Sequence, residues 1–376
     1  MKINTITCHD VYNSGASLQA YALMKYLQEC GHDVKIIDYK PEYLSRHYKL
    51  WIVANPKYEK NMILKVIYLL LKLPGRLWAL KTKKVFDNFR NQYLNITETR
   101  YNSNEELKNN LPEADIYIAG SDQIWNATFQ NGKDEAFYLD FVPNNKIKAS
   151  YAASFATETF PEELKQKTSK MLSKFDYISV REKSGLDILK DMDIKNGVQV
   201  LDPVFLLDKE HWEKMCIDIK CTQKYLLVYD FDNNPLIKEI AIKISEEKGL
   251  KIYTIFKSDY SDKVISQMGP IEFISYIKNA EFIISNSFHG TAYSLIFEKE
   301  FIVTNRVDKI NTRMRDLLSE IGISERLVSN IDGVTCLERL NYSDIKDNID
   351  KLIKRSKLYL DKVIGEYNEE KDIICN

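Results

Sequence analysis

The sequence has little excess charge of either sign and lacks a long apolar run. Its 376 residues carry 53 basic and 54 acidic side chains, a formal net charge of −1, so no overall field attracts nucleic acid and we expect none as a partner. The first residues, Met1 to Cys8, show no charged-then-apolar leader. The six cysteines form no close pair of the kind used in zinc sites or redox motifs. These absences predict a cytoplasmic protein with free thiols.

Several catalytic motifs are also missing. The chain has no glycine-rich phosphate loop ending in Lys-Ser/Thr, no Gly-x-Gly-x-x-Gly, no Gly-x-Ser-x-Gly and no His-Glu-x-x-His. ATPase, dinucleotide oxidoreductase, serine hydrolase and zincin functions are therefore disfavoured. Asp230-Phe231-Asp232 could hold a divalent metal, but a polar turn before Asn233-Asn234-Pro235 is favoured. We expect no metal and no cofactor.

Length and hydrophobic pattern predict an α/β fold with two Rossmann-like lobes and a cleft between them. A chain of this length exceeds the usual size of a single core, and strand patterns alternate with helix patterns throughout. We expect a first lobe over 1–205, a second over 206–341, and a helix over 342–376 that packs back on the first lobe. The Asp202-Pro203 pair marks the crossover between lobes.

The stretch from Arg46 to Arg90 lies in a basic insertion expected at about 43–110. It holds eleven basic and two acidic residues, a local charge of +9, together with Trp51, Tyr58, Tyr68 and Trp78. Its apolar part, Met62 to Leu73, is too short for the roughly 20 residues of a membrane span. One interpretation is a pair of helices that covers the first lobe and exposes a basic face. The alternative is peripheral contact with an anionic membrane.

The exit of one predicted strand, Phe282 to Ser285, is the richest candidate site. Ligands of open α/β sheets bind where strands end and helices begin, because helix N-termini carry unpaired amides. Here Asn286-Ser287-Phe288-His289-Gly290-Thr291 follows the strand. Ser287 or Thr291 can cap the next helix, and Gly290 permits close backbone approach. His289 could bind phosphate or exchange a proton, although a lone histidine is as often structural.

Other strand exits add polar groups. Arg181 could grip a carboxylate or phosphate, or simply pair with Glu182 or a surface carboxylate. Asp122 could accept hydrogen bonds from substrate hydroxyls or cap a helix, and the nearby Trp125 could offer a flat surface to a sugar ring. Asn13 and Gln19 could bind a second polar ligand, with helix capping as the alternative for the Asn13 turn.

These strand exits together resemble the polysaccharide pyruvyl transferase family. The resemblance spans both expected lobes in order and is sparse over 43–111 and after about Leu318. The matching stretches are Asn13-Ser14-Gly15-Ala16-Ser17-Leu18-Gln19-Ala20-Tyr21, Gly120-Ser121-Asp122-Gln123-Ile124-Trp125-Asn126, Tyr151-Ala152-Ala153-Ser154-Phe155, Ser179-Val180-Arg181-Glu182, Leu201-Asp202-Pro203-Val204 and Asn286 to Thr291.

The resemblance implies a two-lobed GT-B-like fold and transfer of a pyruvyl unit from phosphoenolpyruvate to two hydroxyls of a sugar, with a cyclic ketal and phosphate as products. His289 and Arg181 look like the family's catalytic donor-site residues, with His289 as the proton donor. We expect Asn286, Ser287, the Gly290 and Thr291 amides, and Arg313 to bind the donor.

The acceptor, a sugar or lipid-linked oligosaccharide of a bacterial surface glycan, would approach past Asn13, Gln19, Asp122 and Trp125. If it is lipid-linked, the basic 46–90 stretch gains a purpose at the inner face of the membrane. Motif and fold leave two alternatives open. One is a GT-B-like glycosyltransferase that uses a nucleotide sugar, and the other is a non-catalytic partner in glycan assembly.

Overall fold

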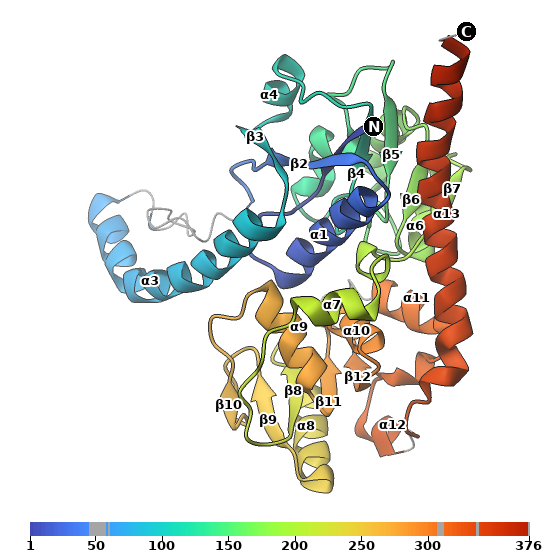
Figure 1. Ribbon diagram of the computed structural model, residues 1–376. Helices are drawn as coiled ribbons and strands as arrows, with labels where there is room; N and C mark the ends of the chain where they lie inside the picture. Colours follow the sequence, from blue (N-terminus) through green and yellow to red (C-terminus); the bar gives the residue numbers. More distant parts are fainter. Residues whose placement is uncertain (45–57, 59–60, 307–311, 336–337, 375–376) are drawn as a thin grey trace.

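The first lobe is built on a parallel sheet (Figure 1). The structure is a computed structural model that describes residues 1–44, 58, 61–306, 312–335 and 338–374. The sheet has the order β3-β2-β1-β4-β5, and each neighbouring pair is parallel. Its strands are β1 (Lys2–Ile6), β2 (Asp33–Tyr39), β3 (Ile96–Tyr101), β4 (Ile116–Ala119) and β5 (Ile147–Ser150). Bridges from Ala149 to Tyr177 and from Ala153 to Val180 join it to a short parallel pair, β6 (Ile178–Val180) and β7 (Gly197–Gln199).

The second lobe repeats the plan with a six-stranded sheet of order β10-β9-β8-β11-β12-β13, again parallel throughout. Its strands are β8 (Tyr225–Tyr229), β9 (Lys251–Thr254), β10 (Lys263–Val264), β11 (Phe282–Ser285), β12 (Glu300–Thr304) and β13 (Leu327–Val328). The α/β architecture predicted from alternating patterns is confirmed. The architecture could be predicted because buried parallel strands appear in the sequence as short apolar runs, and each pair of parallel strands must be joined by a crossover segment.

Helices carry the chain between strands in both lobes. The first lobe has α1 (Ser14–Glu29), α4 (Asn104–Asn109), α5 (Glu162–Leu172) and α6 (Lys183–Asp191). The second has α8 (Pro235–Lys248), α9 (Pro270–Asn279), α10 (Phe288–Ile296), α11 (Thr312–Ile321) and α12 (Ile331–Thr335). Gly249, at φ 63°, caps α8 in the left-handed conformation, as its position after a helical pattern predicts.

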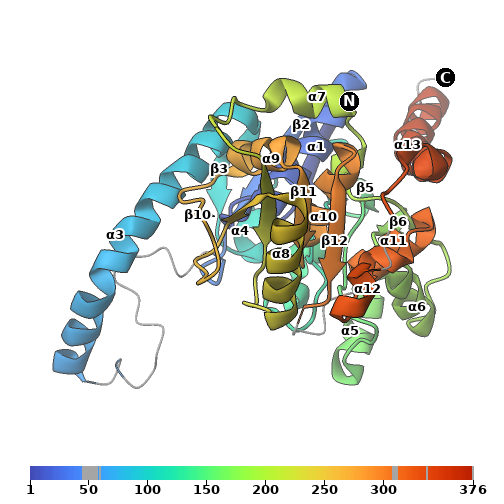
Figure 2. The same ribbon diagram turned by 90° about the horizontal axis from the view of Figure 1, so that it is seen from below.

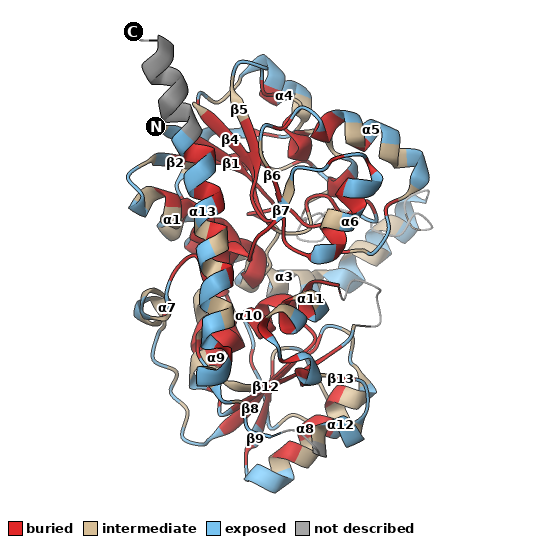
Figure 3. Cartoon of the chain, turned by 90° about the vertical axis from the view of Figure 1, so that its right-hand side faces the viewer, coloured by how far each residue is buried: buried red, intermediate tan, exposed pale blue. Residues whose placement is uncertain are grey.

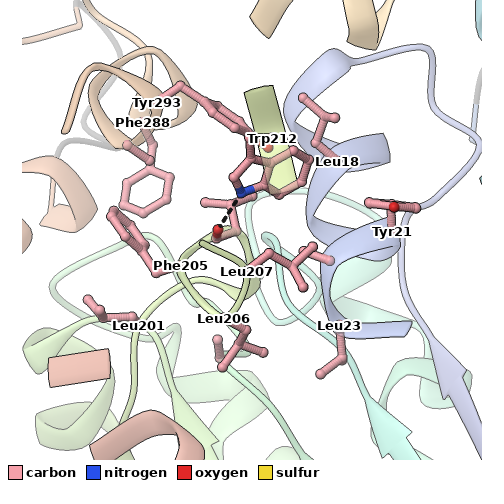
Figure 4. Packing of buried hydrophobic residues seen from close by; sticks show 14 of the residues in the cluster. Leu18, Tyr21, Leu23, Leu201, Phe205, Leu206, Leu207, Trp212, Phe288 and Tyr293 are labelled. Carbon is pink, nitrogen blue, oxygen red and sulfur yellow. Dashed lines mark hydrogen bonds between the residues drawn. The ribbon is translucent and has the colours of Figure 1, made fainter. Parts of the chain in front are cut away.

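The connection between the lobes is itself part of the core. A 3₁₀ turn, Pro203–Phe205, leads into α7 (Lys209–Met215). Trp212 of α7 is fully buried and donates its indole N–H to the Val204 carbonyl at 3.0 Å. Its ring contacts Tyr21 of α1 and Tyr293 of α10, with centroid distances of 5.9 and 5.1 Å (Figure 4). The two lobes are thus packed together through aromatic contacts rather than joined by an exposed linker.

The last helix, α13 (Tyr342–Ile374), runs along both lobes with its exposed face outward (Figure 3). Near its start, Tyr342 donates to the carbonyls of Ser294 and Lys299 in the second lobe. Further along, Tyr359 donates to the Ser150 carbonyl at the end of β5, at 2.8 Å. The helix therefore fixes one side of the two lobes relative to each other.

The basic insertion forms one long helix, α3 (Met62–Tyr93), that projects from the body of the protein (Figures 1 and 2). The expected pair of helices extends over residues 46–57, 59 and 60, which lie outside the described residues, so the covering pair stays a prediction. The insertion ends earlier than expected, because β3 pairs with β2 as part of the first sheet. None of the helices in the described part of the chain is long and apolar enough to cross a membrane.

Candidate active site

Strand ends from both lobes meet at a small polar cavity of about 130 Å³. Its walls come from the loop before α1, the loop after β4, the junction of β11 and α10, and the start of α11. The lining residues are Asn13, Asp122, Gln123, Phe231, Asn286, Ser287, Phe288, His289, Arg306, Arg313 and Met314. Six of the predicted site residues therefore face one cavity.

The segment after β11 enters its helix earlier than the sequence pattern suggested. Helix α10 begins at Phe288, and Ser287 is its N-cap, accepting a hydrogen bond from the Gly290 amide at 3.3 Å. The Thr291 amide and hydroxyl both donate to the Ser287 carbonyl at 3.0 Å. The expectation that the Gly290 and Thr291 amides bind the donor is therefore wrong for this structure. The N–H groups of Phe288 and His289 have no partner among the described residues and are the free amides of this helix N-terminus.

Asn286 and Gly290 serve the local packing. The Asn286 amide donates to Asp230 at 2.7 Å and its oxygen accepts from the Phe231 N–H at 3.0 Å, which ties the exit of β11 to the exit of β8. An added Cβ at Gly290 would lie 3.1 Å from the Cβ of Ser285. The absence of a side chain at Gly290 therefore lets the start of α10 pack closely against Ser285 at the end of β11. Asp230 also accepts from the Asp232 and Asn234 amides, so this stretch is the polar turn that was favoured over a metal site.

Two buried guanidinium groups dominate the electrostatics. Arg181 follows β6 and donates from Nη1 to Asp202 at 2.7 Å, while its Nε and Nη2 make no hydrogen bond within the described chain. Arg313, from α11, likewise leaves Nε unpaired. Both guanidinium carbons lie over the Phe288 ring, 4.9 and 5.6 Å from its centroid. Burial and the neighbouring Arg181 lower the pKa of Arg313 to about 10, which leaves Arg313 charged at neutral pH.

Three carboxylates surround these cations. Asp202 is fully buried and accepts from Arg181, from the Ser121 hydroxyl at 3.2 Å and from the Val204 amide at 3.1 Å. Burial raises the pKa of Asp202, and the charge of Arg181 acts against that rise. Glu182 faces away and accepts from the Ser154 hydroxyl and the Ala156 amide. The counter-ion of Arg181 is therefore Asp202, and neither Glu182 nor a surface carboxylate.

Asp122 is the most exposed of the three acids. Its side chain lies 3.7 Å from Arg181 and 3.9 Å from Arg313, at the cavity wall. Its backbone has φ 73°, a left-handed conformation that is costly for a residue with a side chain. The same residue accepts backbone hydrogen bonds from Ile124 and Ser154. This strained turn directs the carboxylate to both guanidinium groups.

His289 lies at the centre of the arrangement. Its Nε2 atom is 3.6 Å from Asp202 and has no hydrogen-bond partner among the described residues. Burial, and then the positive charge of Arg181, lower the pKa of His289 to about 3. The imidazole is thus neutral at neutral pH in the empty site. An anion bound beside it would raise that pKa toward the range where the ring accepts and donates a proton.

Gly15 of α1 determines how closely the lobes meet at this histidine. A Cβ placed on Gly15 would overlap the imidazole, with Cε1 at 2.6 Å and two other ring atoms nearer. Ordinary carbon contacts are about 3.5–4.0 Å. The first helix of one lobe therefore touches His289 of the other across a position that accepts only glycine.

Two of the four predicted acceptor residues lie away from the cavity. Trp125 is fully buried, stacks on Tyr138 and donates its indole N–H to the Phe137 carbonyl at 3.0 Å. Gln19 is fully buried and donates to Thr7 and to the Ala16 carbonyl. The expectation that either faces a sugar is wrong, since both belong to the core of the first lobe.

Asn13 and Asp122 do line the cavity. Asn13 also caps α1, accepting from the Ala16 amide at 3.1 Å. Asp202 and Gly15 were missed as site residues, and Phe288 was included in the candidate segment without a role. The available signal was that all three lie in the stretches that resemble the family, next to residues that were chosen.

Two facing α/β lobes with a cationic cavity at the ends of their parallel strands define the GT-B class of fold. A putative UDP-N-acetylglucosamine 2-epimerase from Listeria monocytogenes has the same arrangement, with a TM-score of 0.53 at 11% identity over 98% of this chain and 97% of that chain. An E. coli heptosyltransferase, WaaC, solved with ADP, aligns at a TM-score of 0.41 and 12% identity over 94% of this chain and 100% of that chain. At 11% identity, the likeness to the epimerase shows the fold alone.

The family comparison is more specific. The sequence profile of the polysaccharide pyruvyl transferase family matches residues 13–306, from the Asn13 turn to Arg306 at the cavity wall. Arg313 and Met314 of that wall lie beyond the matched residues. None of the curated proteins matches the sequence. The chain belongs to the polysaccharide pyruvyl transferase family, as its strand exits predicted.

Proposed function

We propose that this protein transfers a pyruvyl group from phosphoenolpyruvate to a sugar of a bacterial surface polysaccharide or its lipid-linked precursor. The products are a cyclic ketal and phosphate. One observation carries the proposal: the cavity is lined by Arg313, by the neutral imidazole of His289 and by the start of α10. Arg181 is not a lining residue, but its buried guanidinium carbon lies 4.9 Å from the centroid of the lining Phe288 ring and carries further unpaired N–H donors. Such an arrangement fits a small ligand with two anionic groups and a proton-transfer step.

The two anionic groups of phosphoenolpyruvate match the two kinds of donor. Arg181 and Arg313 offer planar N–H donors suited to carboxylate or phosphate oxygens, and the Phe288 and His289 amides offer a helix N-terminus. Asp202 keeps Arg181 in position through one Nη1 hydrogen bond and leaves its other donors available. Asp122 limits the net positive charge of the empty cavity and would be the group displaced or reoriented by the donor.

The proposed reaction begins with a proton from His289 to the methylene carbon of phosphoenolpyruvate. The resulting oxocarbenium-like carbon takes the oxygen of one sugar hydroxyl, which loses its proton. The bond to the phosphate oxygen then breaks, and a second hydroxyl adds to the same carbon and loses its proton. One proton remains in the new methyl group and one leaves with phosphate, so atoms and charges balance. Arg181 and Arg313 would stabilise the charge that develops on the departing phosphate.

Protonation of His289 requires the donor to be bound. Its pKa of about 3 in the empty site reflects burial and Arg181. A carboxylate and a phosphate beside the ring would offset the positive charge of Arg181 and raise the pKa of His289. Donor binding and proton uptake are then coupled, and the imidazole becomes an acid only when substrate is present.

Room for an acceptor sugar lies beside the donor cavity. A cleft of about 780 Å³ is lined from both lobes, by residues that include Thr128, Glu158 and Thr159 of the first and Thr312 and Arg315 of the second. Thr312 precedes Arg313 in the chain, and Arg315 pairs with Glu158 across the cleft. An acceptor in this cleft would reach the donor past Arg313 and Asp122.

The deciding experiment incubates the protein with phosphoenolpyruvate and lipid-linked glycans from its source organism. We expect acceptor-dependent phosphate release and a product mass that corresponds to an added pyruvyl ketal, both lost with His289→Ala. Thermal stabilisation by uridine or guanosine diphosphate, with no phosphate release, would instead favour a nucleotide-sugar glycosyltransferase. Absence of both activities with intact folding would favour a non-catalytic role.

A further inference from the structure

The first half of α3 exposes an unusual amount of apolar surface. Of fifteen large hydrophobic side chains exposed among the described residues, eight lie between Met62 and Leu77. They are Met62, Ile63, Leu64, Val66, Ile67, Leu70, Leu71 and Leu77, with exposed fractions from 41% to 84%. Within the described part of the chain, the helix is anchored through its second half, where Phe86 and Phe89 are buried. A concentration of this kind marks an interaction surface.

Basic residues line one side of the same helix. In the first half of the helix, Lys65, Lys72 and Arg76 are separated by seven and four positions, which at 100° per residue places them within about 20° of one line. Ile63, Ile67 and Leu70 fall on the opposite side. There is no acidic residue between Met62 and Phe86. The helix is therefore amphipathic, with a broad apolar face and a narrow cationic stripe.

We propose that this half of α3 lies in the surface of an anionic lipid bilayer, with Ile63, Ile67 and Leu70 among the acyl chains and the lysines reaching the headgroups. The charge pattern favours an anionic bilayer over a second copy of the chain, because lipid headgroups supply the acidic partners that this segment itself lacks. Long basic side chains beside an apolar face are typical of helices at membrane surfaces.

The apolar stretch of α3 is long enough to lie on a membrane but too short to cross one. Met62 to Leu73 spans twelve residues, which as a helix is about 18 Å, well short of the roughly 30 Å of a bilayer core. Pro74 and Gly75 follow this stretch within the helix.

The attached end of α3 lies close to the candidate active site. Phe86 meets the Tyr12 ring at a centroid distance of 6.0 Å, and the Lys83 ammonium lies 5.4 Å from the same ring. Tyr12 precedes Asn13, which lines the cavity. A bilayer held by α3 would therefore lie near the wall of the cavity that Asn13 forms, where a membrane-anchored acceptor could approach the donor. This last consequence rests on the proposed function, whereas the membrane contact does not.

The test is sedimentation of the full protein with vesicles of phosphatidylcholine alone or with phosphatidylglycerol, without phosphoenolpyruvate. We expect binding to the anionic vesicles at low salt that weakens as salt increases. The triple variant Ile63→Gln, Ile67→Gln, Leu70→Gln should bind at least tenfold more weakly, and Lys65→Glu with Lys72→Glu should lose the preference for anionic vesicles. The matched control, Ile217→Gln with Leu358→Gln, removes two exposed apolar side chains elsewhere and should bind as the parent does.

The triple variant should fold as the parent does, because none of Ile63, Ile67 and Leu70 is buried. Equal unfolding midpoints for the variant and the parent would confirm this. No vesicle binding at low salt, or equal binding by the triple variant, would overturn the proposal. The proposal would also be overturned if equilibrium sedimentation showed a dimer of the parent that the triple variant does not form, and if vesicles bound neither protein. Since phosphate release on a water-soluble acceptor is a separate readout, failure here is distinguishable from failure of the proposed reaction.

Discussion

Replacing Gly15 with alanine tests whether the meeting of the two lobes positions His289. The new methyl group would overlap the imidazole, and even Cε1, the farthest of the three nearest ring atoms, is only 2.6 Å from the added carbon. Since carbon contacts are comfortable at about 3.5–4.0 Å, the ring or the helix must move by roughly 1 Å or more. The imidazole is buried between Gly15, Asp202 and Arg181 and has little room to do so.

The expected magnitudes separate function from folding. Gly15 lies in the first turn of α1, where alanine would ordinarily stabilise the helix by about 0.5–1 kcal/mol. Overpacking against a buried ring costs about 1–3 kcal/mol, so the net change in unfolding free energy should be at most about 2.5 kcal/mol. A misplacement of about 1 Å in a catalytic group can lower the rate about 100-fold. We therefore expect kcat/KM to fall about 100-fold in a protein that still folds.

The assay measures acceptor-dependent phosphate release from phosphoenolpyruvate, with urea unfolding as the stability readout. Gly365→Ala is the matched control, because that glycine lies in α13 with nothing within 4 Å of an added Cβ. It should keep full activity and gain up to about 1 kcal/mol. Wild-type kcat/KM in Gly15→Ala would refute the argument that this contact positions the histidine.

Four further substitutions test the site and its surroundings. In the wild type the free energy of unfolding should fall as pH drops below about 6.5, because histidine in the unfolded chain binds a proton there while folded His289, with its pKa of about 3, does not. The variant His289→Gln should show a smaller fall when urea titrations are made at several pH values. Parallel stability curves for the two proteins would contradict this prediction. Arg313→Gln should weaken phosphoenolpyruvate binding about 10- to 100-fold by calorimetry, and unchanged affinity would remove Arg313 from the donor site. Asp202→Asn should lower the free energy of unfolding by about 3–5 kcal/mol, because it leaves Arg181 without its buried counter-ion. Added phosphoenolpyruvate should stabilise this variant more than it stabilises the parent protein. Equal stabilisation of the two proteins would argue against an anion site there. Trp125→Phe should cost about 1–3 kcal/mol by leaving a buried carbonyl unpaired and leave the acceptor KM unchanged, whereas a raised KM would return Trp125 to the acceptor site.

Much of the fold could be predicted because its signals are local. Tyr225–Tyr229 and Phe282–Ser285 form strands with the bounds that their apolar runs predict. Helix Pro235–Lys248 likewise lies between its predicted ends, with proline at the start and glycine after the end. The start of α10 was harder to find, because Phe288 and His289 follow a cap residue that could equally be read as loop. Composition alone does not say whether the apolar face of α3 has a protein partner, so a covering pair of helices and a membrane contact both stay predictions.

The site was predictable to the extent that strand ends gather polar groups. His289, Arg181, Arg313 and Asp122 do meet, as parallel strands in facing lobes require. Trp125 follows a strand end as closely as Asp122 does, yet its ring turns into the core. No sequence spacing distinguishes the two, because a side chain's direction after a strand depends on the backbone turn, here a left-handed Asp122.

The amino-acid sequence by itself determined the order of strands and helices, the division into two α/β lobes and the family, since each depends on short-range pattern or on motifs in a fixed order. Only the tertiary structure decided which carboxylate pairs with Arg181, which amides remain unpaired at α10, and that Gly15 of one lobe touches His289 of the other. Those relations join residues from separate segments, and their distances arise from how the lobes pack. The depressed pKa of His289 has the same origin, because burial and the charge of Arg181 act on it only once the lobes have closed.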